Sequence, residues 1–240
     1  MSSNKKSLFV IGGIAAFLQL ATITGYSIAL VILGPKFATA EEFFLIYQES
    51  PLASFLRGDF LLLVLIGLYL GTFPALYVAL REINPIYAAL ATLFTILTIS
   101  GTFATESTFA LKHVGEQYVA TSNQAVQAQL VAAGEAVIAS DMWNSSGAYM
   151  GGILLQGSGV MISVIMLRSK NFSKVTAYSG IIANGFDLIQ HVLHPFAPAI
   201  AEPIQMFMGV FYLVWFPMLG WDMLKIARKG LQDEEIEYVE

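Results

Sequence analysis

Four polar side chains that could do chemistry follow one another along an otherwise apolar segment. Asn184, Asp187, His191 and His194 are separated by steps of three or four residues. Steps of this size place side chains on one face of an α-helix. That face would carry an amide, a carboxylate and two imidazoles, which are groups that bind polar ligands and metal ions.

A second polar stripe is predicted on an earlier apolar segment. Thr98, Thr102 and Glu106 again follow helical steps. Counted from the turn at residues 81–85, Glu106 is expected at the same depth as His194. The two stripes therefore predict one ligand site near the outer surface, composed of Thr102, Glu106, Asn184, Asp187, His191 and His194.

A metal ion is the alternative occupant of this region. Zinc or another divalent metal would take its ligands from His191, His194 and either Asp187 or His113, and would leave one position for a hydrolytic water. No HExxH motif supports such a site. At 1.5 Å per residue, Asp187 and His194 are about 10 Å apart, so a shared ion requires a helix distorted near Pro195. Apart from this metal, no cofactor is expected.

Four interpretations of the polar stripe stay open. A carboxylate cannot face lipid cheaply, so the stripe is expected to point into the protein. It could be a hydrogen-bonded network that fixes helix register, because buried polar groups need partners. It could line an outward-facing cavity that binds or senses a small or lipidic ligand, which is our working hypothesis. The remaining alternatives are a metal-dependent intramembrane hydrolase acting on lipids and a small-solute or proton-coupled transporter.

The composition of the chain sets the class of fold that must position these residues. Of 240 residues, 56% are hydrophobic and only 12% are charged, and the mean hydropathy is +0.68. This is too apolar for an ordinary soluble domain and indicates an all-α integral membrane protein. The chain has no cysteine, which excludes disulfides and thiolate metal sites. Neither a P-loop nor a G-x-S-x-G motif is present, and no nucleic-acid partner is expected.

Six apolar segments are long enough to cross a bilayer, which takes about 20 helical residues. The predicted bundle of six transmembrane helices spans residues 8–33, 60–80, 86–105, 147–167, 175–194 and 204–226.

Basic residues predict the orientation of this six-helix bundle. Nine lysines and arginines fall on one side, namely Lys5, Lys6, Arg81, Arg168, Lys170, Lys174, Lys225, Arg228 and Lys229. Only Lys36, Arg57 and Lys112 fall on the other side. The positive-inside rule then places both termini in the cytoplasm, in a multi-pass protein of the cell membrane. Residues 1–230 are expected to form one membrane domain, followed by an acidic cytoplasmic tail at 231–240.

The two long outer connections are predicted to contain helices of their own. Residues 35–59 alternate apolar and charged side chains, which is typical of short interfacial helices, with a break at Ser50-Pro51. The alanine-rich stretch 124–140, capped by Ser122 or Asn123, is expected to extend outward from the fourth span as one over-long helix. A helix that lies flat on the outer surface and a seventh span are the alternatives.

Paired glycines predict places where helices approach closely. Gly67/Gly71 and Gly147/Gly151 are each four residues apart, so each pair lies on one helix face. Packing within the bundle is the first expectation for both pairs, and a homodimer through either face is the alternative. Membrane lipids are the other expected partners.

From Phe60 to Gly230, the layout resembles bacterial membrane proteins catalogued as domain of unknown function 4386. The shared features are TFPALYVALREINP at the end of the second span, DMWNSSGAYMGG before the fourth and MLRSKNFSKVTAYSGII before the fifth. A final span that ends in Lys229-Gly230 is also similar. The chain departs from the pattern at Asn171-Phe172-Ser173, where the family commonly has a proline, and in its histidine cluster. The resemblance implies architecture and localisation but no activity.

Overall fold

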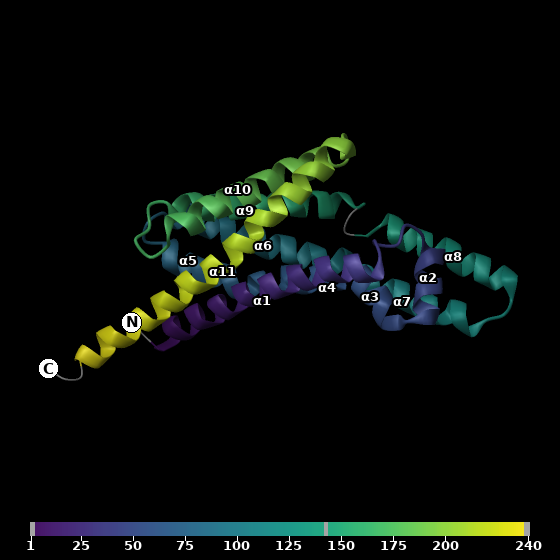
Figure 1. Ribbon diagram of the computed structural model, residues 1–240, viewed down its shortest axis with the longest axis horizontal. Coiled ribbons are helices and arrows are strands. Elements are labelled where there is room, and N and C mark those ends of the chain that lie inside the picture. The colour runs from purple at the N-terminus through teal and green to yellow at the C-terminus, as the bar shows by residue number, and fades with distance from the viewer. Residues whose placement is uncertain (1–2, 142–143, 238–240) are drawn as a thin grey trace. The chain divides into compact units, whose positions relative to one another are not determined.

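The computed structural model describes residues 3–141 and 144–237, with side chains throughout except at Ser3, Glu202 and 230–237. Within these ranges the chain forms eleven α-helices and no strand (Figure 1), which confirms the all-α prediction. The helices are α1 (Ser3–Leu33), α2 (Ala40–Glu49), α3 (Pro51–Arg57), α4 (Phe60–Gly67), α5 (Tyr69–Leu80), α6 (Pro85–Thr105), α7 (Thr108–Ala120), α8 (Gln124–Ala139), α9 (Ser146–Met166), α10 (Lys174–Leu193) and α11 (Pro198–Glu237). The predicted acidic tail falls partly outside the described residues.

Five helical stretches in the described part of the chain are long and apolar enough to cross a membrane. They are Asn4–Leu33, Phe60–Leu80, Pro85–Ala120, Ser146–Met166 and Pro198–Lys229. These stretches correspond to five of the six predicted spans. The remaining predicted span is α10, whose 20 residues suffice in length but include the polar stripe, which lowers its hydropathy.

The helices form two compact units. Unit 1 comprises Met1–Leu20, Gly67–Ile99 and Gly151–Glu240, and unit 2 comprises Ala21–Ile66 and Ser100–Met150.

Unit 1 is held together by close helix packing at glycines. A methyl group on Gly12 of α1 would lie 2.6 Å from the Cβ of Ala75 in α5. A methyl group on Gly71 of α5 would lie 2.8 Å from the Cβ of Ala15. The Gly71 face is therefore used for packing within the chain, whereas Gly147 has open space around it. The homodimer stays a prediction.

Two further helices of unit 1, α10 and α11, pack along one another, as Figure 1 shows. Their interface is built around large aromatic side chains of α11. Trp215 and Phe216 are fully buried, and the rings of Tyr212 and Phe216 stack with centroids 5.3 Å apart. This rigid aromatic layer fixes the face of α11 that α10 meets.

Unit 2 contains the short helices predicted in the first outer connection. Ser50 separates α2 from α3, as the Ser50-Pro51 dipeptide predicts, and its hydroxyl accepts a hydrogen bond from Ala53 N at 3.3 Å. The apolar face of α2 is occupied by protein, because Phe43 and Phe44 are fully buried in a core shared with α7 and α8.

The prediction of one over-long helix across residues 124–166 is wrong. Asn123 caps α8 as expected, but α8 ends at Ala139 and α9 begins at Ser146. The reason is packing within unit 2. Gly134 of α8 fits against Phe44, and the Glu135 carboxylate accepts a hydrogen bond from Ala40 N at 2.7 Å. These contacts hold α8 to α2.

Candidate functional site

The polar stripe of α10 is buried over most of its length. Thr176, Asn184 and Asp187 are each less than one tenth exposed, so these side chains point into unit 1 as their spacing predicts. His191 is half-buried, and His194 is exposed at the end of the helix. The stripe therefore leaves the protein interior at its outer end.

The carboxylate of Asp187 meets the hydroxyl of Tyr212 from α11. The Tyr212 Oη atom lies 2.8 Å from Asp187 Oδ2, 3.0 Å from Gln156 Oε1 and 3.3 Å from Asn184 Oδ1. A phenol carries one proton, so only one of these oxygens can receive it at a time. Asp187 is the closest, and a carboxylate is the strongest acceptor of the three when ionised. Oxygens of the buried Asn184, Asp187 and Tyr212 and of the half-buried Gln156 thus converge on one site.

The side-chain amides of Asn184 and Gln156 differ in whether a second hydrogen bond fixes their orientation. The Asn184 Nδ2 group donates to the Gly180 carbonyl at 2.8 Å, which fixes the Asn184 oxygen on the side of Tyr212. No such bond fixes Gln156 in the described network, so rotation of its amide lets an N–H donate to the Tyr212 oxygen. Asp187 and Asn184 then remain as two acceptors that compete for the single phenol proton.

Glycines make the space that these polar side chains fill. A methyl group on Gly159 of α9 would lie 2.0 Å from Asn184 Oδ1. A methyl group on Gly152 would lie 2.0 Å from His191 Nε2. The polar residues of α10 therefore fit into gaps on α9 that any larger residue would close.

Gly180 lies one helical turn before Asn184 in α10, and two buried polar atoms flank it. Ser163 Oγ and Trp215 Nε1 have no hydrogen-bond partner among the residues that the structure describes. A methyl group on Gly180 would lie 2.2 Å from the first and 2.4 Å from the second. Buried polar atoms of this kind are usually satisfied by an internal water or a ligand.

At the start of α10, a carboxylate from α11 completes the cap. Ser173 is the N-cap residue, and Asp222 Oδ2 accepts hydrogen bonds from Ser173 N at 2.9 Å and from Thr176 Oγ1 at 2.5 Å. A negative charge is favourable beside the positive end of a helix dipole. Polar groups thus follow α10 from Asp222 through the Gly180 region to Asp187.

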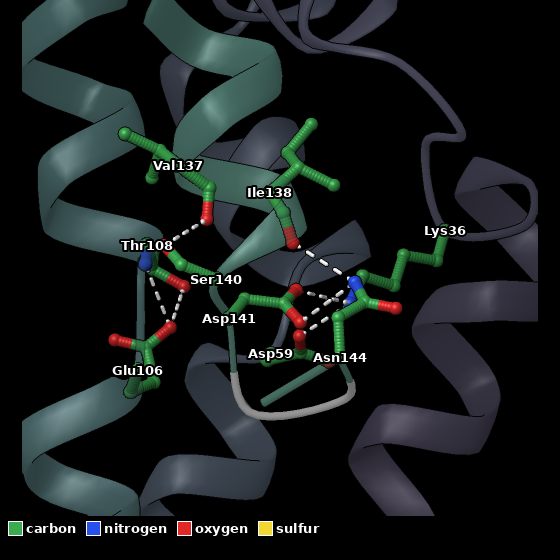
Figure 2. Close-up of polar contacts among 9 residues, drawn as sticks. All are labelled: Lys36, Asp59, Glu106, Thr108, Val137, Ile138, Ser140, Asp141 and Asn144. Atoms are coloured by element: carbon green, nitrogen blue, oxygen red, sulfur yellow. Dashed lines mark hydrogen bonds and ion pairs between the residues drawn. The ribbon is translucent and has the colours of Figure 1, made fainter. Parts of the chain in front are cut away.

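The other residues of the predicted ligand site belong to unit 2. Figure 2 shows that the Glu106 carboxylate is used within its own turn, where it accepts hydrogen bonds from the backbone N–H of Thr108 at 2.8 Å and from the Thr108 hydroxyl. Thr102 is buried. The expectation that Thr102 and Glu106 share one site with Asp187 stays a prediction.

The predicted metal ligands are not gathered into a site. Within residues 3–141 and 144–237, no three histidine, aspartate or glutamate side chains are grouped so as to hold a metal ion. His194 is exposed, whereas Asp187 is buried and bonded to Tyr212. His113 lies on α7, and its Nε2 atom is 3.0 Å from the side-chain nitrogen of Gln117. The ligand set of His113, His191, His194 and Asp187 therefore stays a prediction that no grouping of the described side chains supports.

A charged cluster in unit 2 was not predicted from the sequence. Lys36 Nζ lies 2.5 Å from Asp59 Oδ2 and 3.5 Å from Asp141 Oδ2, and the Asn144 amide donates to Asp141 at 3.2 Å (Figure 2). Both aspartates are at most 5% exposed. This cluster ties together the segments after α1, before α4 and after α8, and its lysine offsets part of the negative charge.

Two cavities of the described part of unit 1 can be compared with the α10 stripe, and neither is lined by Asn184, Asp187, His191 or His194. One has a volume of about 210 Å³ and lies between the α9–α10 loop and α11. The other, of about 260 Å³, is lined by apolar side chains together with Asn84, Tyr87 and Arg168. Asp187 therefore lines neither of these two cavities.

The sequence carries only a weak signal for the partners of Asp187. Gln156 is an isolated amide within an apolar segment, and Tyr212 lies in an aromatic run, a pattern that is also typical of residues that pack between helices. Only the meeting of α9, α10 and α11 identifies them as part of the site.

No protein-family model, curated protein or solved structure matches the chain. The resemblance to the domain of unknown function 4386 proteins is therefore a prediction that rests on the sequence motifs.

Proposed function

We propose that the chain is a multi-pass membrane protein that binds a small cation, in the first place a proton, at Asp187 inside unit 1. In this proposal six helices cross the cell membrane and both termini are cytoplasmic. The five long apolar helices support five of these spans, and α10 is the sixth. Its polar residues face the interior of unit 1, which makes a membrane position acceptable.

The observation that carries the proposal is the buried carboxylate of Asp187. Among the described residues, no lysine or arginine forms an ion pair with it, and its hydrogen bond comes from Tyr212. An ionisable side chain inside a membrane is costly, and such residues usually belong to binding sites, ion pathways or proton relays. The surrounding oxygens of Asn184 and Tyr212 favour a positively charged occupant.

A proton fits this network without a change in the backbone. When Asp187 is ionised, Tyr212 donates its proton to the carboxylate. When Asp187 is neutral, its own O–H donates to Tyr212, and the phenol proton turns to Asn184 Oδ1, 3.3 Å away. Both arrangements use the same atoms, so the site can exchange a proton while the helices stay in place.

Proton-coupled transport is the second candidate function. It is favoured by the polar groups that continue along α10 toward Asp222, including the unpartnered Ser163 hydroxyl and Trp215 indole N–H. A transporter requires such a path on both sides of the protonated residue, whereas a sensor requires only a connection to one side. The metal-dependent hydrolase is not developed further, because its ligand set is not assembled.

Thermal unfolding of the purified full chain between about pH 5 and pH 8 tests the proposal, since this is the range in which physiological proton switches respond. Asp187→Asn should remove a component of the pH dependence of the unfolding midpoint, because the amide cannot titrate. Glu106→Gln is the matched control, because it removes one carboxylate from unit 2 and should leave that component intact. An identical pH profile for the wild type and Asp187→Asn would contradict proton binding at Asp187.

A further inference from the structure

The first cavity of unit 1 is lined by an excess of positive charge. Its walls include Lys170 and Asn171 from the α9–α10 loop, and Lys225 and Lys229 from α11. Lys225 and Lys229 are four residues apart, so they share one face of α11 and stand across the cavity from Lys170. We call this cavity the lysine cleft.

The one carboxylate in the lysine cleft, that of Asp222, already accepts two hydrogen bonds. Asp222 Oδ2 receives hydrogen bonds from Ser173 N and Thr176 Oγ1, and Asp222 is 2% exposed. Three exposed ammonium groups therefore face a single buried carboxylate. The lysines share the cleft with hydrogen-bonding side chains, and the positive end of the α10 dipole adds to the same field. This combination suits a multiply charged anion with several acceptor oxygens.

The surroundings of the lysine cleft suggest where such an anion comes from. Trp221 of α11 lies beneath two cations, with Lys225 Nζ 5.6 Å and Arg228 Cζ 5.9 Å from its ring centroid. Tryptophan beside lysine and arginine is typical of the interface between a bilayer and the cytoplasm. The cleft lies on the lysine-rich side of the proposed topology, at the level of lipid headgroups. Basic pockets between helices on this side of a membrane bind phosphorylated lipid headgroups.

We propose that the lysine cleft binds a phosphate group, carried either by an anionic membrane lipid or by a small soluble phosphate. Lys170, Lys225 and Lys229 contact the phosphate oxygens, and Asn171 donates a further hydrogen bond. A volume of about 210 Å³ accommodates a phosphate with a small substituent and leaves lipid chains outside. This site is independent of Asp187, so either proposal can fail without the other.

The test compares two triple variants of the full chain in nanodiscs. K170Q/K225Q/K229Q removes the charges of the cleft, and K5Q/K6Q/R228Q removes three charges from the same predicted side of the membrane but outside the cleft. The probes are phosphatidic acid in phosphatidylcholine nanodiscs and, separately, inorganic phosphate or glycerol 3-phosphate added to pure phosphatidylcholine nanodiscs. Binding is read by native mass spectrometry and by the shift of the unfolding midpoint.

The wild type should bind phosphate-bearing probes about 100-fold more tightly than the cleft variant, from roughly a fivefold change for each of the three lysines. The control variant should lose less than about tenfold. Binding of phosphatidic acid alone identifies a lipid site, and binding of the soluble phosphates identifies a soluble ligand; both uphold the phosphate site. Equal losses in the two variants, or no binding of any probe by a wild type that melts cooperatively, would overturn it.

Discussion

At the scale of single residues, the site depends on a hydroxyl and a carboxylate that face one another across two helices. Tyr212 donates to Asp187 over 2.8 Å, and both side chains are buried. A hydrogen bond to a charged group is worth more than one between neutral groups. The pair should therefore be coupled energetically, beyond what either side chain contributes by packing.

Tyr212→Phe should lower the free energy of unfolding by about 1.5–3 kcal/mol, because it removes the hydrogen bond to Asp187 but keeps the ring. The same change in the background of Asp187→Asn should cost less, with a coupling energy of about 0.5–3 kcal/mol. Denaturant titration of the purified variants in detergent would measure both free energies. Tyr178→Phe, on the exposed face of α10, is the control and should be nearly neutral. Strictly additive effects would show that the two side chains do not interact.

Gly159→Ala should destabilise the protein by about 1–3 kcal/mol, because the added methyl group collides with Asn184 and overpacks the interface. Gly157→Ala is a control on the same helix, since a methyl group there meets nothing within 4 Å. That control should be neutral or slightly stabilising, because alanine favours helix over glycine. The thermal unfolding midpoints of the two variants measure this difference in stability. A Gly159→Ala protein as stable as the control would contradict the close fit of α9 and α10.

At the scale of elements, α10 is held at its first turn by a cap that comes from another helix. Asp222→Ala removes the acceptor for Ser173 N and Thr176 Oγ1, and should cost about 0.5–2 kcal/mol, as loss of a helix cap does. Hydrogen exchange should accelerate in the first turn of α10 and not in α8, whose cap is Asn123. Unchanged protection at residues 174–177 would show that Asp222 does not support α10.

The limits of most elements were predictable from sequence, because they depend on local signals. The break at Ser50-Pro51 and the Asn123 cap follow from the residues present there. The separation of α8 from α9 was not predictable in the same way. It depends on the fit of Gly134 and Glu135 against α2, which lies about 90 residues earlier in the chain and leaves no periodic signal in α8 itself.

The candidate site, like the ends of the helices, could be predicted only in part from the sequence. The face of α10 that carries Asn184 and Asp187 follows from helical spacing alone, and both residues are buried. Their partners Tyr212 and Gln156 depend on which helices meet and in which rotation, and apolar sequences specify that poorly. Helical spacing puts Asp187 and His194 on one face but about 10 Å apart along the axis, so it does not by itself predict that they share a metal ion.

At the scale of the whole molecule, the proposed topology can be tested directly because the chain has no cysteine. Single cysteines placed at Lys170 and at Gln124 should react with a membrane-impermeant thiol reagent from opposite sides of the membrane. Lys170 should be labelled only after the cytoplasmic side is opened, and Gln124 in intact cells. Labelling of both positions from the same side would contradict six spans with cytoplasmic termini.

The most direct measurement of the central claim is infrared difference spectroscopy of the full chain between acidic and alkaline pH. Protonation of a buried aspartate produces a carboxylic acid C=O stretching band, and ionisation removes it. Proton binding at Asp187 predicts such a band in the wild type, shifted in Tyr212→Phe and absent from Asp187→Asn. A difference spectrum that keeps the same band in Asp187→Asn, or that shows no carboxylic acid band in the wild type, would contradict the claim.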